Sequence, residues 1–151
     1  MTKGLSKEFF EELAARANAN PDLFRRLGTA DMTLVVKVDY ADKSDYYELV
    51  FAGYQCKGVS QLKSIADAAK GAVVISGPYS AWREMIENIV VNGHADLEHT
   101  LNTLTLMDTP LKVEADNQLD ADLFYRYQQN LQEFFDGAGR ADSSAQTATV
   151  Q

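Results

Sequence analysis

The chain has 151 residues, 46% of them hydrophobic and 24% charged, which is ordinary for a soluble globular protein and enough for one domain with a sizeable core. Its 22 acidic side chains outnumber 14 basic ones, giving a formal net charge of −8, which argues against a nucleic-acid-binding surface and against a basic patch for anionic membranes. The single cysteine allows no internal disulfide, and no stretch has the pattern of a signal peptide or a membrane span, so we expect a cytoplasmic protein.

Two helices are expected at the N-terminal end. Ser6 is placed to cap the first helix, and Asn20-Pro21 to open a second, shorter helix that ends at Gly28. The apolar positions of the first helix, at helical spacing, are Phe9, Phe10, Leu13 and Ala17. An exposed apolar patch around the two phenylalanines would permit a dimer.

Two alternating runs, 32–40 and 46–54, predict an antiparallel hairpin. The apolar face consists of Leu34, Val36, Val38 and Tyr40 in the first run and of Tyr47, Leu49 and Phe51 in the second. Gly53 and Gly58 suggest a bulge or bend where the chain leaves the hairpin, and residues 62–69 are expected to be weakly helical or irregular.

An apolar strand at 72–76 and a helix at 80–91 follow. Every position at 73–75 is apolar, which indicates a central strand covered on both faces. The helix carries one apolar stripe, formed by Trp82, Met85, Ile86 and Ile89. Val91-Asn92-Gly93 is expected to end it.

The last third of the chain predicts a short helix capped by Asp96 with Leu97, Leu101 and Leu104 on one side, then a strand at 110–114. A long apolar helix begins at Asp120 or Asp122 and ends at 137–139. We expect one domain, residues 1–137, and a disordered small-residue tail, residues 138–151.

Three segments resemble the sterol carrier protein type-two family of lipid-binding domains. Ala30 to Phe51 is similar to the opening hairpin of that family, Ala68 to Glu87 to its apolar strand and aromatic-led helix, and Pro110 to Leu131 to its last strand and closing helix. The resemblance implies an α+β fold in which a curved, mostly antiparallel five-stranded sheet is covered by helices, with an apolar tunnel between them. Domains of this family bind sterols, fatty acids, acyl-CoAs or other hydrophobic molecules and do no chemistry on them.

The helices carry more apolar surface than one small sheet needs, which predicts a wall for a hydrophobic ligand. Methionine and large aromatic side chains suit an adaptable wall, although each of them would equally serve in a core. The predicted ligand-binding residues are Trp82, Met85, Ile86, Ile89, Leu101, Leu104, Leu106, Met107, Phe124, Tyr127, Leu131 and Phe134. No cofactor and no metal are expected.

Polar side chains that could serve catalysis, metal binding or ligand binding have less support in the sequence. His94 and His99 lie five residues apart, not the three or four that place two ligands on one helical face, and no third ligand is near, so we expect neither a metal site nor acid–base catalysis. Cys56 has no neighbouring His, and only Lys57 lies beside it to lower the pKa of its thiol, so we do not expect a reactive thiol. Tyrosines that could reach a ligand headgroup, or simply mark the core boundary, are Tyr46, Tyr47, Tyr54, Tyr79, Tyr125 and Tyr127.

Three functions fit these observations. The first is a non-catalytic binding or carrier protein for a hydrophobic small molecule. The second is an accessory subunit that presents such a molecule to, or docks on, a partner enzyme. The third is a small isomerase or cyclase of the cone-shaped α+β kind, with a buried Asp or His as general base, although such folds end in strands and this chain ends in a helix. The chain could act as a monomer or as a homodimer.

Overall fold

The computed structural model describes residues 5–19, 22, 25, 31–53, 55–105, 109–115 and 118–150, with side chains of the last helix described as far as Gly139. Its elements, in chain order, are α1 (Lys7–Ala19), β1 (Met32–Asp39), β2 (Ser44–Ala52), β3 (Gln55–Leu62), the 3-10 helix η1 (Ile65–Asp67), β4 (Val73–Pro78), α3 (Tyr79–Asn92), α4 (Leu101–Leu104), β5 (Lys112–Glu114) and α5 (Gln118–Val150). The helix expected at 21–27 falls outside the described residues, apart from two positions. In the described part of the chain, no helix is both long and apolar enough to cross a membrane.

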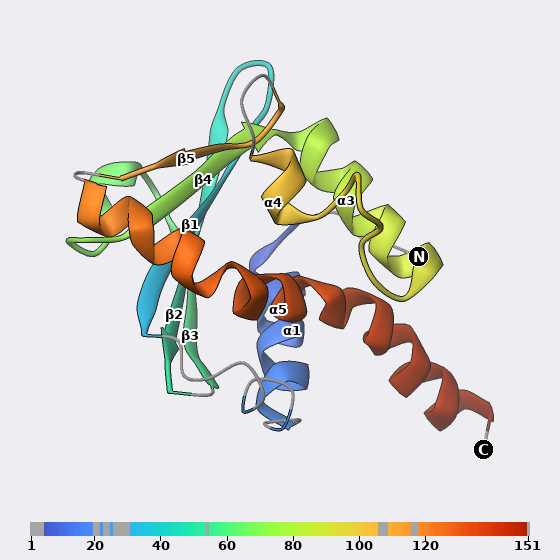
Figure 1. The fold of residues 1–151 in the computed structure, drawn as a ribbon. Coiled ribbons are helices and arrows are strands. Elements are labelled where there is room, and N and C mark those ends of the chain that lie inside the picture. Colours follow the sequence, from blue (N-terminus) through green and yellow to red (C-terminus); the bar gives the residue numbers. More distant parts are fainter. Residues whose placement is uncertain are drawn as a thin grey trace.

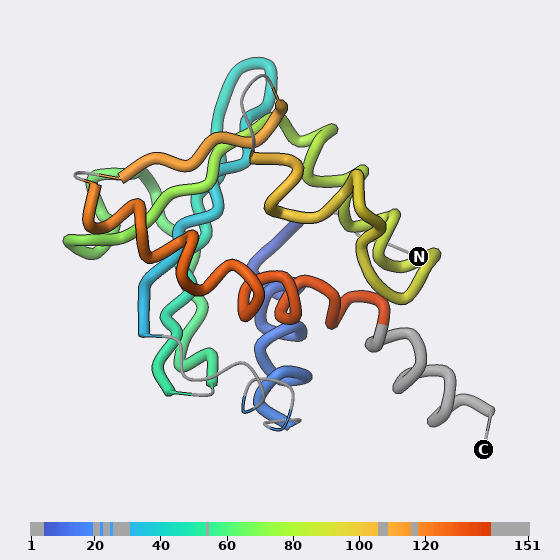
Figure 2. Tube along the Cα trace, viewed as in Figure 1, coloured from blue at the N-terminus to red at the C-terminus, as the bar shows by residue number. Residues whose placement is uncertain are grey.

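The strands form one five-stranded sheet in the order β3-β2-β1-β4-β5 (Figure 1). β1 and β4 are parallel, and the other three pairings are antiparallel. Figure 2 shows β5 running beside β4, although the helices α3 and α4 separate the two strands in sequence. The predicted α+β fold with a mostly antiparallel five-stranded sheet is therefore confirmed.

The hairpin of β1 and β2 confirms the alternation seen in the sequence. Leu34 pairs with Leu49, and Val36 with Tyr47, so apolar side chains of both strands share one face. All four are buried in the main core together with residues of α1, α3 and α5. The opposite face carries a small cluster of Val35, Ala72 and Val74, so β4 is covered on both faces, as its three apolar residues predict.

The strand β3 was not predicted from the sequence. It occupies an edge of the sheet with much of its length exposed, so its side chains need no strict alternation. Its pairing with β2 shifts between Val50 and Phe51, which leaves Lys57 without a residue opposite it and confirms the bulge expected beside Gly58. Helix α1 lies against β3, where Asn18 Nδ2 donates to the Cys56 carbonyl (3.0 Å) and Asn18 Oδ1 accepts from the Cys56 N–H (2.9 Å).

Helices α1 and α3 begin and end near the predicted residues. Ser6 Oγ accepts a hydrogen bond from the N–H of Phe9 (3.1 Å), which confirms the N-cap. The predicted apolar stripe of α3 is its buried face, and the helix ends at Gly93 in the left-handed conformation (φ 85°), which favours glycine. The exposed patch expected around Phe9 and Phe10 is wrong, because Phe10 is fully buried against Tyr47 and Phe135, and Phe9 is partly buried against the same core.

Two predicted boundaries are wrong. α4 is a single turn that begins after Thr100, not after Asp96, and Leu97 is 86% exposed instead of facing the core. α5 begins at Gln118 and continues through Gly137 and Gly139 to Val150. The predicted end at 137–139 is wrong: the helix continues, and at Gly139 the missing side chain lets α5 pack closely on the end of α3. The division into a domain at 1–137 and a disordered tail stays a prediction.

Candidate functional site

The apolar stripe of α3 forms one wall of the interior. Trp82, Met85 and Ile89 are fully buried, and Ile86 is nearly so. The indole N–H of Trp82 donates to the Lys37 carbonyl on β1 (3.1 Å), which satisfies its one polar group and fixes the ring over the sheet. These side chains leave only hydrocarbon and sulfur facing the interior.

Helix α5 forms the facing wall and brings aromatic rings from distant parts of the chain together. Phe134 lies edge-to-face with Phe51 of β2 (5.2 Å between centroids), and Phe135 lies tilted on Trp82 (6.0 Å). Phe124 and Leu131, which come earlier in the same helix, are also fully buried. The interior between α3, α5 and the sheet is therefore continuous and apolar.

The predicted ligand-binding residues converge on this interior as far as the structure describes them. Eight of the twelve are buried: Trp82, Met85, Ile86, Ile89, Leu101, Phe124, Leu131 and Phe134. Leu104 and Tyr127 are half-buried against the same cluster. Leu106 and Met107 lie outside the described residues. The contact of these side chains with a ligand stays a prediction.

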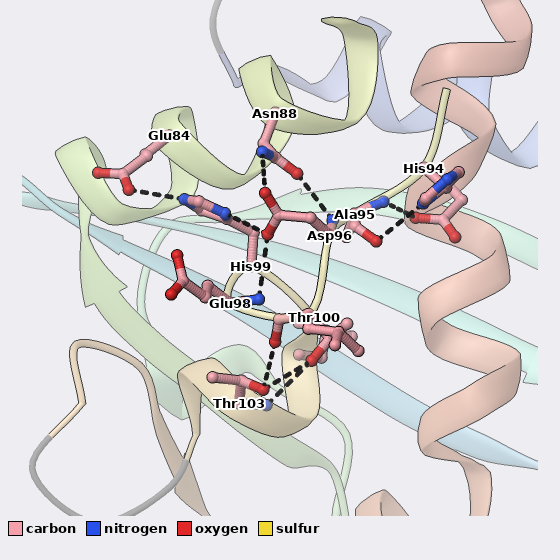
Figure 3. Close-up of polar contacts among 12 residues, drawn as sticks. Glu84, Asn88, His94, Ala95, Asp96, Glu98, His99, Thr100 and Thr103 are labelled. Atoms are coloured by element: carbon pink, nitrogen blue, oxygen red, sulfur yellow. Dashed lines mark hydrogen bonds and ion pairs between the residues drawn. The ribbon is translucent and has the colours of Figure 1, made fainter. Parts of the chain in front are cut away.

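A cluster of four polar residues, which we call the polar clamp, holds the α3–α4 connection on the outer side of α3 (Figure 3). It consists of Glu84, Asn88, Asp96 and His99. The two ring nitrogens of His99 lie 2.7 Å from Asp96 Oδ1 and 2.8 Å from Glu84 Oε2. Asn88 Nδ2 donates to Asp96 Oδ2 (2.9 Å), and Asn88 Oδ1 accepts from the Asp96 N–H (2.9 Å).

The same connection is tied to α5 by hydrogen bonds from its backbone. The N–H of Ala95 donates to Asp136 Oδ1 (3.2 Å), and the N–H of Leu101 donates to Gln132 Oε1 (2.7 Å). Thr100 caps α4, since its Oγ1 accepts from the N–H of Thr103 (3.1 Å). Together with the polar clamp, these contacts fix the segment that carries Leu101 and Leu104 over the apolar interior.

Sequence reasoning missed the polar clamp as a unit. The spacing of Asp96 and His99 is visible in the sequence, but a helix cap explains it equally well. Glu84 and Asn88, by contrast, join the cluster only because the chain turns back after Gly93. The i, i+4 spacing of those two residues on the polar face of α3 was the one available signal.

The hydrogen bonds of the polar clamp displace the pKa values of His99 and Asp96. Hydrogen bonding to Asp96, and then to Glu84, raises the pKa of His99. Hydrogen bonding from His99, and then from Asn88, lowers the pKa of Asp96. A neutral imidazole can donate from only one nitrogen, so only the charged ring can donate to both carboxylates.

The polar clamp is therefore expected to weaken as pH rises. Because the pKa of His99 is raised in the folded protein, His99 contributes stability that is fully present below pH 6.5. That stability is lost as the pH rises through the pKa of His99 in the folded protein. Asp96, whose pKa is lowered in the folded protein, contributes stability that is present above pH 3.8. That stability is lost as the pH falls through the pKa of Asp96 in the folded protein.

We expect NMR titration to place the pKa of His99 above 6.5, and the variant Glu84→Gln to lower that pKa. His94→Gln, which alters the neighbouring exposed ring, should leave it unchanged. A pKa at or below 6.5 in the unmodified protein would contradict the observed pairing.

Two of the candidate tyrosines make contacts within the fold, and a role for any candidate tyrosine at a ligand headgroup stays a prediction. Tyr47 donates to the Leu5 carbonyl (3.3 Å), and Tyr79 stacks on Tyr40 (5.3 Å between centroids). Burial raises the pKa of the Cys56 thiol to about 11, so it is protonated at neutral pH and a poor nucleophile, as the sequence indicated. Tyr54 lies outside the described residues. Within the described ranges, no group of three or more His, Cys, Asp or Glu side chains is arranged to hold a metal ion.

Known proteins resemble this chain in three-dimensional structure, whereas comparisons of its sequence find no match. No protein-family model matches the sequence, and no curated protein matches it. The crystal structure of sterol carrier protein 2 superposes with a TM-score of 0.65 at 17% identity, over 89% of this chain and 95% of that one.

A second likeness is the solution structure of a conserved hypothetical protein from Thermus thermophilus, described as possibly a sterol carrier protein. It superposes with a TM-score of 0.61 at 15% identity, over 88% of this chain and 87% of that one. A third structure, described as the ubiquinone synthesis protein UbiJ-SCP2, reaches a TM-score of only 0.42, at 20% identity over 85% of this chain and 88% of that one, and supports no further argument. The predicted resemblance is confirmed for the fold.

Proposed function

From its sterol carrier protein 2 fold, we propose that this chain is a non-catalytic carrier for a hydrophobic small molecule, held in the apolar interior between the sheet, α3, α4 and α5. The observation that carries the proposal is the convergence of the predicted wall residues on one cluster in that fold. In this fold a long apolar helix, α5, lies opposite a second apolar helix, α3. The α4 segment, which hydrogen bonds hold on α5, lies between them.

The energetics favour a ligand of mainly hydrocarbon character. Each methylene group moved from water into an apolar site contributes about 0.8 kcal/mol, so a chain of about eight to ten carbons can be bound without ion pairing. Sulfur and aromatic rings, as in Met85 and Phe124, adapt to differently shaped ligands. The proposal includes no chemical step, because the described wall residues at buried positions carry no side chain suited to proton transfer or nucleophilic attack.

The proposed carrier acts in the cytoplasm and releases its ligand to a membrane or to a partner enzyme. Its acidic character, with a net charge of −8, favours release at a protein over adsorption to anionic lipid.

Native mass spectrometry of the purified protein, followed by denaturing extraction, tests the proposal. We expect a hydrophobic compound to leave the protein at near one-to-one stoichiometry, or fatty alcohols, fatty acids or sterols to shift the mass of the apo protein. A clean apo mass with no shift on adding any of these compounds would overturn the carrier proposal.

A wall-filling variant tests where the ligand lies. Leu104 is half-buried at the rim of the cluster, so the larger ring of Leu104→Trp should occupy ligand space with little damage to the core. We expect binding to weaken by about tenfold or more, which corresponds to about 1.4 kcal/mol. The control is Leu97→Trp, which makes the same change at an exposed position of the same segment and should leave binding unchanged. Equal affinities in both variants would place the ligand elsewhere.

A further inference from the structure

One side of α5 carries three polar residues spaced four apart, Gln128, Gln132 and Asp136, which places them on one face of the helix. The last two have clear roles. Gln132 Oε1 accepts from the N–H of Leu101 (2.7 Å), and Gln132 Nε2 donates to Asp136 Oδ1 (3.0 Å). Asp136 Oδ1 also accepts from the N–H of Ala95. This part of the face holds the α3–α4 connection in place.

Gln128, the first of the three, is different. Its amide oxygen Oε1 is shielded from solvent and has no hydrogen-bond partner among the residues that the structure describes. Phe124, one turn before it, and Leu131, one turn after it, are both fully buried in the main core. A buried carbonyl oxygen without a donor destabilises the folded protein, and nearly all such oxygens in proteins are paired. An acceptor left unpaired beside an apolar interior is therefore suited to a donor that arrives with a ligand.

We propose that Gln128 Oε1 accepts a hydrogen bond from the hydroxyl group of an uncharged lipid alcohol whose hydrocarbon part lies in the apolar interior. This inference rests on the proposed carrier function and names the ligand class that the carrier selects. The hydroxyl supplies the donor that the protein lacks at this point, while the hydrocarbon part makes the contacts already described.

The charges on the same helix select against an anionic lipid. A fatty-acid carboxylate only accepts hydrogen bonds, so with the amide oriented as in the structure it would set two acceptors against each other at Gln128 Oε1. Asp136 adds a carboxylate two turns further along the same face. Arg126, a cationic residue of α5, lies on its exposed side and is not placed to neutralise a carboxylate in the interior. A neutral hydroxyl meets none of these difficulties.

Three ligands of equal chain length test the inference: decan-1-ol, its methyl ether 1-methoxydecane, and decanoate. Their dissociation constants are measured by displacement of Nile red. We expect the unmodified protein to bind the alcohol about 5- to 10-fold more tightly than the ether, as one neutral hydrogen bond would give. Decanoate should bind more weakly than the alcohol.

The variant Gln128→Leu should bind alcohol and ether equally, with its affinity for the ether retained. Thermal unfolding should show this variant at least as stable as the unmodified protein, because it removes an unpaired buried oxygen. The matched control is Gln129→Leu, the same change at the exposed neighbouring position, which should keep the preference for alcohol.

The outcomes separate the two proposals. If alcohol and ether bind the unmodified protein equally, or if decanoate binds more tightly than decan-1-ol, the role of Gln128 is overturned and the carrier function stands. If none of the three displaces the dye, and if native mass spectrometry shows no binding of fatty alcohols, fatty acids or sterols, the carrier function fails, and the ligand class fails with it.

Discussion

Replacing Trp82 with alanine is expected to lower the free energy of unfolding by about 3–5 kcal/mol. The side chain is fully buried, packs on Phe135 and donates its one N–H to the Lys37 carbonyl. The substitution removes the largest fully buried side chain, leaves a cavity beneath α3 and deprives that carbonyl of a donor. Since domains of this size are typically stable by about 5–15 kcal/mol, the variant should unfold at much lower urea concentration.

The conservative variant Trp82→Phe separates the two contributions. It keeps an aromatic ring near Phe135 but cannot donate to Lys37, so we expect a smaller loss, near that of one hydrogen bond and some packing, about 1–2 kcal/mol. Urea denaturation followed by circular dichroism measures both variants. A loss below about 1 kcal/mol for Trp82→Ala would show that this ring faces an open space that its removal merely widens, not a closely packed core.

Gly139→Ala is expected to destabilise the protein by about 1–3 kcal/mol, although alanine is the better helix former. A β-carbon at this position would lie 2.8 Å from the Ile89 carbonyl oxygen and 2.9 Å from the backbone of Gly93. Both obstacles are backbone atoms at the end of α3 and cannot rotate away. The helix α5 would have to move off α3, which would disturb the packing of Ile89 in the interior.

Gly137→Ala is the matched control, two residues earlier in the same helix. Its β-carbon would meet only Leu13 Cδ2 at 3.6 Å, which is ordinary contact, so we expect a gain of about 0.5–1 kcal/mol from reduced chain entropy. Urea denaturation of the two variants should therefore give changes of opposite sign. A gain for both would mean that α5 does not approach α3 at Gly139.

Periodicity predicted the elements whose two faces differ strongly. The strands β1 and β2 and the helix α3 each turn one face to the core, and the alternation or the 3.6-residue spacing of their apolar side chains follows from that. The strand β4 was predicted from its continuous apolar run, because both of its faces are covered. The residues that line the interior could be predicted from the sequence for the same reason. Its use for a ligand could not be derived from the sequence, because Trp82 or Phe124 is equally suited to a core.

Local sequence failed where a distant contact decides the structure. Asp96 has the sequence of a helix cap, but its carboxylate and backbone bind His99 and Asn88, and the helix begins only after Thr100. Glycine at 137 and 139 is typical of a helix end, but α5 continues because only a residue without a side chain fits against α3 at Gly139. In both cases tertiary packing overrides local propensity.

The two outer strands of the sheet have a consequence for how the protein behaves at high concentration. An open strand edge exposes free N–H and C=O groups that can recruit a second chain and start aggregation. At one edge, β5 has only three residues, too few to serve as a template. At the other, Asn18 occupies both backbone groups of Cys56, as a neighbouring strand would, and the bulge at Lys57 interrupts the regular spacing beyond it. The short β5 and the interrupted edge of β3 therefore limit self-association of the protein through its backbone.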